Sequence, residues 1–336
     1  MKILIAPLNW GLGHASRCVP LVQRLLDEGH EVVVGGDGDS LTLLRKHFPK
    51  LRYVYLAPLN LRYSAGKRQV WAMLKAFPKL IMWSLKDHAL LKAVLHEEPF
   101  DRVISDNRFG LYLNHQSPIT NNQCECIYMT HQLHIMLPRG WRWAEPLASR
   151  IHARIYTRFN KVWVPDHEDP QKSLAGELSH NDQLPITNYQ YIGSLSRFEY
   201  QSPITNHQSP LYDVVAVLSG LEPHRTLLEK EIIHRYTDPS LQGGEGVGCS
   251  VLVVQGLMAR PNTRIKRGNI TMVPYLADNE LAVALIGAKR IIARSGYSTI
   301  MDLDALGVLD KAELIPTPGQ PEQEYLARFI AQKMHK

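Results

Sequence analysis

The chain opens with MKILIAPLNWGLGHASRCVPLVQRLLDEGHEVVVGG (residues 1–36), and this stretch decides the fold. The spacing of its apolar residues predicts a short strand, a glycine-rich turn and a helix, over 2–7, 10–14 and 16–28. Gly29 ends the helix, and a second strand follows over 31–34. A strand, a helix and a strand joined by short connections are typical of a parallel sheet covered by helices.

The same pattern recurs along the chain. In the first part it predicts further strands over 102–106, 127–131 and 161–165. A second series of elements is predicted later, with a helix over 226–236 and strands over 213–218, 251–255 and 290–293. We therefore predict an α/β chain with an N-terminal domain, a connecting segment and a C-terminal domain, over residues 1–195, 196–212 and 213–336.

The composition excludes several classes of protein. The chain has 336 residues, of which 45% are hydrophobic and 21% charged, so it is neither disordered nor of low complexity. Cys18 and Cys249 stand alone, and Cys124-Glu125-Cys126 lacks the spacing of a zinc knuckle, so we expect a reducing compartment and no structural zinc. No apolar stretch reaches the roughly 18–20 residues that cross a bilayer. We expect a cytoplasmic protein, either soluble or peripheral on the inner face of the membrane.

The charge balance narrows the choice of partner. The net charge is +6, from 38 lysines and arginines against 32 aspartates and glutamates. This balance suits nucleic acid, anionic lipid or phosphorylated small molecules. No basic block is long enough for a nucleic-acid tail, so no nucleic-acid partner is expected. The segment 67–83 mixes aromatic, aliphatic and lysine residues, which indicates either contact with an anionic membrane or a helix packed on the sheet.

Short insertions interrupt the pattern of strands and helices. The motif Pro-Ile-Thr-Asn occurs three times at irregular spacing, at 118–121, 185–188 and 203–206. Each copy is far too short for a repeat-protein unit. Because the copies are rich in proline, asparagine and serine, we interpret them as surface loops, together with the glycine-rich segment 242–248.

Two turns in the second half have the form of phosphate-binding sites. In the stretch ARSGYSTIMD (293–302) a strand ends, small residues follow, and a helix begins near Ser298. Free N–H groups at a helix start favour an anion, and Arg294 adds charge. Ser219-Gly220 forms a similar turn between a strand and a helix. If the two strands are neighbours, both turns lie at one sheet edge and suit a nucleoside diphosphate, whereas the alternative is two ordinary capped helices.

The first glycine turn carries a histidine. Gly11-Leu12-Gly13 partly matches the dinucleotide fingerprint, with Asp37 and Asp39 near the position of a ribose-binding acid. His14 at the helix start would face the same crevice, unless it serves only as a cap. The pairs Asp37–Asp39 and Asp302–Asp304 spell Asp-x-Asp, but the first is predicted in a turn and the second in a helix, so no metal site is expected.

Other polar residues lie at predicted strand and helix ends. Asp106 and His131 follow two strands of the first domain and are candidates to bind an acceptor, although polar residues are common in loops. The amides of Gln320 and Gln323 open the last helix, where they suit a ligand with many hydroxyl groups. Glutamate and glutamine are also common at ordinary helix starts.

Together these motifs resemble the GT-B glycosyltransferases, specifically glycosyltransferase family 28. The resemblance rests on Gly11 to His14 and on Arg294-Ser295-Gly296 with its following helix, and it covers most of the chain. It implies two Rossmann-like domains with parallel sheets that face a central cleft. The implied reaction transfers a hexosyl or N-acetylhexosaminyl group from a nucleotide donor, expected to be UDP-linked, to a glycan or a lipid-linked acceptor of the cell envelope.

The resemblance also implies roles for single residues. His14 is the general base, and Gly13, Asp106 and His131 lie on the acceptor side. The donor residues are Ser219, Gly220, Arg294, Ser295, Gly296, Thr299, Asp302, Gln320 and Gln323. By this resemblance Ser295 and Gly296 hold the diphosphate, Asp302 binds the ribose hydroxyls, and the two glutamines contact the sugar. No metal and no other cofactor is expected.

Three other functions fit parts of the sequence. A nucleotide-sugar epimerase can share the fold and the donor site, and a non-catalytic nucleotide-sugar-binding protein would keep donor binding alone. A Rossmann oxidoreductase fits the first loop but leaves the two turns of the second half unexplained.

Overall fold

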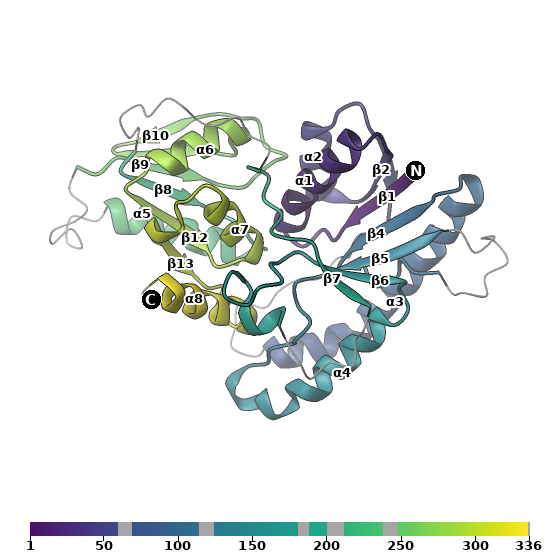
Figure 1. Ribbon diagram of the computed structural model, residues 1–336. Helices are drawn as coiled ribbons and strands as arrows, with labels where there is room; N and C mark the ends of the chain where they lie inside the picture. Colours follow the sequence, from purple (N-terminus) through teal and green to yellow (C-terminus); the bar gives the residue numbers. More distant parts are fainter. Residues whose placement is uncertain (60–68, 114–123, 181–187, 200–211, 238–247, 335–336) are drawn as a thin grey trace. The chain divides into compact units, whose positions relative to one another are not determined.

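The computed structural model describes residues 1–59, 69–113, 124–180, 188–199, 212–237 and 248–334 (Figure 1). The chain divides into two compact units. The first comprises Met1–Trp10 and His14–Leu195, and the second comprises Gly11–Gly13 and Ser196–Lys336. Each unit is built around one β-sheet.

The first unit contains a seven-stranded parallel sheet of order β3-β2-β1-β4-β5-β6-β7. Its strands are β1 (Lys2–Pro7), β2 (Glu31–Gly36), β3 (Arg52–Tyr55), β4 (Arg102–Asp106), β5 (Glu125–Met129), β6 (Lys161–Val164) and β7 (Tyr189–Tyr191). Its helices are α1 (Gly13–Asp27), α2 (Gly38–His47), α3 (Gln69–Glu97) and α4 (Glu145–Tyr156), with 3-10 turns η1 (Arg139–Ala144) and η2 (Gly176–Leu178). The strand order reverses between β1 and β4.

The core of the first unit explains why these segments form a parallel sheet. Ile3, Leu4 and Ile5 are fully buried, which is expected for a central strand with helices on both faces. Both α3 and α4 contribute to one core cluster, through Leu91, Leu95, Ala153 and Tyr156. The two helices therefore pack on the same core.

Gly110 allows an unusually close approach of α3. A Cβ atom at this position would overlap the carbonyl oxygen of Ser84 and lie 2.7 Å from the Cβ atom of Asp87. Only a residue without a side chain leaves room for the α3 backbone there.

The second unit contains a six-stranded sheet of order β10-β11-β9-β8-β12-β13. Only β10 runs antiparallel to its neighbour. The strands are β8 (Val214–Val217), β9 (Val251–Val254), β10 (Ile265–Arg267), β11 (Ile270–Val273), β12 (Arg290–Arg294) and β13 (Ala312–Ile315). The helices are α5 (His224–Thr237), α6 (Asp278–Gly287), α7 (Tyr297–Ala305) and α8 (Pro321–Met334), with the 3-10 turn η4 (Leu309–Lys311). Here the strand order reverses between β8 and β12.

The predicted fold class is confirmed, because the chain is an α/β protein with one parallel sheet and one sheet that is parallel except for β10. Several local predictions were wrong. Gly38 and Asp39 open helix α2 instead of lying in a turn. The pattern also missed the edge strands β3, β7 and β10, whose exposed side chains dilute the apolar signal, and the buried strand β11.

Some sequence features fall outside the part of the chain that the structure describes. These are the Pro-Ile-Thr-Asn copies at 118–121 and 203–206, residues 242–247 of the glycine-rich segment, and residues 67–68. Of the copy at 185–188 only Asn188 is described, and β7 begins at the next residue. Within the described ranges, no helix has the length and apolar character needed to span a membrane.

Candidate functional site

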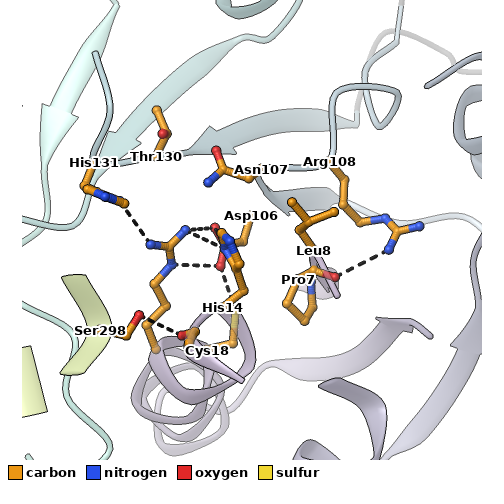
Figure 2. A network of polar contacts seen from close by, with 12 residues as sticks. Pro7, Leu8, His14, Cys18, Asp106, Asn107, Arg108, Thr130, His131 and Ser298 are labelled. Carbon is orange, nitrogen blue, oxygen red and sulfur yellow. Dashed lines mark hydrogen bonds and ion pairs between the residues drawn. The ribbon is translucent and has the colours of Figure 1, made fainter. Parts of the chain in front are cut away.

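The first candidate site lies at the carboxyl ends of β1 and β4. The strand order of the first sheet reverses between these two strands, and ligands of open α/β sheets bind at such a switch point. Asp106 is the last residue of β4 and pairs with Pro7 of β1. His14 lies in the first turn of α1, and His131 follows the neighbouring strand β5. Three segments that are distant in sequence therefore contribute to one cluster (Figure 2).

The carboxylate of Asp106 is the centre of this cluster. Its Oδ1 atom lies 3.1 Å from Nδ1 of His14, and its Oδ2 atom accepts a hydrogen bond of 2.8 Å from Nε of Arg17. Nη2 of Arg17 also donates to Oδ1 of Asp106. Nη1 of the same guanidinium lies 3.2 Å from Nδ1 of His131 (Figure 2). Arg17 therefore connects the carboxylate with both imidazoles.

The sequence interpretation missed Arg17. The residue lies three positions after His14 in α1, so the two side chains share one face of the helix. This spacing could have indicated from the sequence that Arg17 lies beside His14.

Burial and charge set the ionisation of the cluster. Burial by itself raises the pKa of Asp106, but the charge of Arg17 and the contact with His14 outweigh it and bring the pKa to about 2. Burial lowers the pKa of His14 below its ordinary value, and the charge of Asp106 opposes this only in part. At neutral pH the carboxylate is therefore ionised and the His14 imidazole is neutral.

The position of the proton on His14 depends on its two neighbours. Nδ1 lies 2.8 Å from Nη2 of Arg17, which can only donate, and 3.1 Å from the carboxylate of Asp106, which can only accept. With the proton on Nδ1 the ring donates to Asp106 and Nε2 keeps a lone pair, whereas with the proton on Nε2 the Nδ1 atom accepts from Nη2 of Arg17. The His14 side chain is 16% exposed, whereas that of Asp106 is 0% exposed. In the first of these two tautomers the imidazole can accept a proton at Nε2.

A second buried arginine, Arg108, is directed away from the cluster around Asp106 (Figure 2). Nε and Nη2 of Arg108 donate to the two carboxylate oxygens of Asp87 at 2.9 and 2.8 Å, and Nη1 donates to Asp37 at 3.1 Å. Asp37, considered above as a ribose-binding acid, also accepts a hydrogen bond of 2.9 Å from Asn9. Asp37 is 3% exposed and its carboxylate accepts hydrogen bonds from both Asn9 and Arg108. We therefore assign it a structural role in the interior of the unit.

The second candidate site lies at the carboxyl ends of β8 and β12 in the second unit. These strands are neighbours, with Val217 paired to Ala293, so the condition stated for the two turns is met. The strand order reverses between them. Ser219 and Gly220 follow β8, and α7 begins at Tyr297 directly after the turn that follows β12. The first N–H groups of α7 have no acceptor within the helix, which suits an anion.

Arg294 is 4% exposed and connects the segments that follow β8 and β13 at this edge of the sheet. Its guanidinium donates to the carbonyl oxygens of His224 at 2.8 Å and Pro316 at 3.0 Å. Among the described residues, Nε of Arg294 and Nε2 of His224 are buried without a hydrogen-bond partner. An unpaired buried donor costs about 1–3 kcal/mol, so an acceptor supplied by a ligand would be favourable here.

Other predicted donor residues form two groups. Ser295 donates to the carbonyl oxygen of Gln323 at 2.8 Å, and the side chain of Gln323 donates to Gln320 at 2.7 Å, so these three lie together. Asp302 accepts hydrogen bonds from Ser196 at 2.8 Å and Arg197 at 3.1 Å, and it is 6% exposed. Burial raises the pKa of Asp302, and the charge of Arg197 opposes this.

The remaining predicted residues are placed as follows. Thr299 is half-buried in the first turn of α7, Gly296 immediately precedes that helix, and Gly13 is the first residue of α1. In the described ranges, no group of three or more His, Cys, Asp or Glu side chains is arranged to hold a metal ion.

Comparison with known proteins defines the class of this fold. The chain is similar to an uncharacterized glycosyltransferase of Methanosarcina acetivorans, with 24% identity over 344 residues that cover 99% of this chain and 84% of the relative. An uncharacterized glycosyltransferase of Methanosarcina mazei is 24% identical over 342 residues, with the same coverage. No family model matches the chain, and membership of glycosyltransferase family 28 stays a prediction.

Solved structures with the same fold include several sugar transferases. A spinosyn forosaminyltransferase has a TM-score of 0.55 at 15% identity, covering 100% of this chain and 95% of its own. A spinosyn rhamnosyltransferase complexed with thymidine diphosphate has a TM-score of 0.55 at 13% identity, with 100% and 92% coverage. A putative UDP-N-acetylglucosamine 2-epimerase from Listeria monocytogenes has a TM-score of 0.54 at 13% identity, with 100% and 88% coverage. The chain has the fold of the GT-B glycosyltransferases.

Proposed function

We propose that this protein is a glycosyltransferase that moves a sugar from a nucleoside diphosphate to a hydroxyl group of an acceptor. The observation that carries the proposal is the imidazole of His14, held by the buried carboxylate of Asp106 at the switch point of the first sheet. The names of the two Methanosarcina relatives support the same reaction class.

The reaction is a direct displacement at the anomeric carbon. The acceptor oxygen attacks that carbon while Nε2 of His14 takes the hydroxyl proton, and the bond to the diphosphate oxygen breaks with its electron pair leaving on the diphosphate. The ionised carboxylate of Asp106 accepts Nδ1–H and stabilises the imidazolium that forms. We therefore assign Asp106 to the orientation of His14 instead of to direct acceptor contact, because it is 0% exposed.

The donor is assigned to the second unit. Backbone N–H groups at the start of α7 and in the turn of Ser219 and Gly220 hold the diphosphate, and electrostatic stabilisation of the leaving group removes the need for a metal or other cofactor. The unpaired nitrogens of Arg294 and His224 at the same sheet edge support this assignment. The family resemblance assigns Asp302 to the ribose. Its carboxylate is 6% exposed and already accepts hydrogen bonds from Ser196 and Arg197, so this role rests on the resemblance alone.

The sugar and the acceptor follow from the resemblance alone. We propose UDP as the carrier, a hexosyl or N-acetylhexosaminyl group as the sugar, and a glycan or lipid-linked acceptor near Gly13 and His131. Gln320 and Gln323 are assigned to the sugar, since their paired amides adjoin Ser295. One structural neighbour is complexed with thymidine diphosphate, so both pyrimidine carriers belong in the test.

A thermal-shift panel followed by product detection tests the proposal. UDP-sugars and TDP-sugars are expected to raise the melting temperature, whereas NAD is not. With lipid-phosphate acceptors present, mass spectrometry should then detect the glycosylated product. The variant His14→Gln should keep the donor-induced shift and lose turnover, while His96→Gln, at an exposed position of α3, serves as the matched control. Unchanged turnover in His14→Gln would show that the base is wrongly assigned.

The likeness to the putative UDP-N-acetylglucosamine 2-epimerase favours one second candidate. An epimerase would convert the donor without an acceptor and would exchange the hydrogen at C2 of the sugar with solvent. Incubation of UDP-N-acetylglucosamine in deuterated water, followed by NMR, separates the two reactions. A donor-induced thermal shift with neither reaction would instead indicate a binding protein.

A further inference from the structure

Helix α3 exposes an apolar stripe to solvent. Phe77, Ile81 and Leu85 recur at intervals of four residues, and together with Met82 they are 49–60% exposed. Residues at this spacing lie on one face of a helix. Trp83 lies on the opposite side of the helix and is buried, so the exposed stripe is a second apolar face that the core of the unit does not use.

The segment η1–α4 exposes a similar stripe. Trp143, Leu147 and Ile151 again recur every four residues, and Trp143 is 75% exposed. Trp141 stacks on Trp143, with ring centroids 6.1 Å apart and planes inclined by 24°. Large exposed aromatic rings of this kind are uncommon on monomeric soluble proteins unless they meet a partner.

Helices α3 and α4 lie in one region of the first unit (Figure 1). The C-terminal half of α3 packs on the same core cluster as α4, and Trp83 of α3 contacts Phe109, which in turn contacts His152 of α4. Of the 15 large apolar side chains that are exposed in the described residues, eight lie on these two segments, and the other seven are scattered singly. We call the eight residues the α3–α4 surface: Phe77, Ile81, Met82, Leu85, Trp141, Trp143, Leu147 and Ile151.

Exposed positive charges surround the α3–α4 surface. Its exposed cations are Lys79, Lys86, Arg139, Arg142, Arg150 and Arg154. Within residues 77–89 and 139–155 the acids are Asp87 and Glu145. Asp87 is buried against Arg108, whereas Glu145 bonds the backbone N–H of Leu137 and pairs with Arg142 at 3.7 Å. The other five cations have no carboxylate partner among these two acids, so the outer face keeps a net positive charge. Aromatic and aliphatic side chains bordered by lysine and arginine match the boundary between lipid headgroups and acyl chains.

We propose that the α3–α4 surface docks the protein on a bilayer rich in anionic phospholipid. The tryptophans and aliphatic side chains enter the headgroup region while the arginines contact lipid phosphates. A second copy of this chain fits less well, because a two-fold interface would bring the same arginines face to face. The proposal shifts the membrane contact from residues 67–83 to the exposed part of α3 and adds η1–α4. It does not depend on the proposed reaction.

Vesicle co-sedimentation with the full chain tests this proposal. The protein should pellet with phosphatidylglycerol-rich vesicles and stay in the supernatant with pure phosphatidylcholine vesicles, and added salt should weaken the binding. The double variant Arg150→Gln and Arg154→Gln should bind about thirtyfold more weakly, since each basic residue near an anionic surface contributes about fivefold. Trp143→Ser with Leu147→Gln should weaken binding about tenfold or more.

Matched controls lie on the second unit. Lys266→Gln with Arg267→Gln removes two exposed cations, and Leu227→Gln removes an isolated exposed leucine, so both should bind like the wild type. Circular dichroism and thermal unfolding establish that every variant is folded. Equal pelleting of all variants, or no pelleting with anionic vesicles, would overturn the proposal. So would a dimer in sedimentation velocity that Trp143→Ser dissociates, or salt-sensitive binding of RNA that exceeds binding of vesicles.

Discussion

Arg17 and Arg108 are both buried in the first unit, both bind aspartates, and both act near the carboxyl edge of the same sheet. Arg108 is enclosed by the carboxylates of Asp37 and Asp87, whose side chains are 5% and 0% exposed, and by the carbonyl group of Ala57. Arg17 shares its carboxylate with His14, which reaches solvent, and also contacts His131. A buried ion pair by itself therefore does not mark a reaction site. A partly exposed imidazole in contact with the ion pair distinguishes the cluster of Arg17 from that of Arg108.

The largest effect is expected when the carboxylate partner of each arginine is replaced by an amide. Asp106→Asn should lower turnover by about 10²–10⁴-fold, because the amide can donate to Nδ1 of His14 and then fixes the proton on Nε2, where a base needs a lone pair. Asp87→Asn makes the same change beside Arg108 and should leave turnover per folded molecule unchanged. Steady-state kinetics on both purified variants check this. Equal losses would mean that the two clusters have the same role.

The next effect is on stability. Arg108→Ala leaves the carboxylates of Asp87 and Asp37 buried without their cation and should cost about 3–5 kcal/mol of unfolding free energy. Arg52→Ala, at a side chain that is 53% exposed, should cost less than about 1 kcal/mol. Urea unfolding followed by circular dichroism measures both. A loss below about 1 kcal/mol in Arg108→Ala would show that the second cluster is not a structural centre.

A smaller effect depends on pH. The pKa of Asp106 is lowered to about 2 in the folded protein, from an ordinary value of 3.8, so its stabilising effect is complete above pH 3.8 and is lost as the pH falls through 2. The difference corresponds to about 2 kcal/mol. The stability difference between wild type and Asp106→Asn should shrink by that amount between about pH 4 and pH 2 in urea unfolding series. A difference independent of pH would contradict the assigned ionisation.

The smallest effect separates charge from geometry at Arg17. Arg17→Lys keeps the positive charge but loses the forked contact with Asp106 and with it one charged hydrogen bond. We expect this loss to lower turnover about tenfold. The acid limb of the pH–rate profile should stay below the ordinary pKa of histidine, because burial of His14 is unchanged. A variant with wild-type turnover would assign Arg17 to folding alone.

Much of the fold could be predicted because central parallel strands are continuous apolar runs. Residues 2–7, 102–106 and 290–293 were recognised in this way. The edge strands β3 and β10 were missed because their side chains are mostly exposed and the apolar pattern is weak there. The break between β2 and α2 was misjudged because Asp37-Gly38-Asp39 has the composition of a turn.

The candidate sites could be predicted only where a single segment carries the signal. His14 and the turn at Ser295 are local motifs, so a single segment of sequence is enough to name each as a candidate. The contact of Asp106 with Arg17 joins residues 89 positions apart, and nothing in either segment specifies it. Asp302 illustrates the same limit, because Ser196 and Arg197, its partners, lie over 100 positions away.

Gly110 has a consequence for any genetic study of this protein. Every side chain placed there would push α3 away from the segment that follows β4, and thereby separate Asp87 from Arg108. In a saturation mutagenesis screen scored by product formation, this glycine would tolerate no replacement and would resemble a catalytic residue. Sites ranked by mutational intolerance alone would then include a position whose only contribution is the absence of atoms.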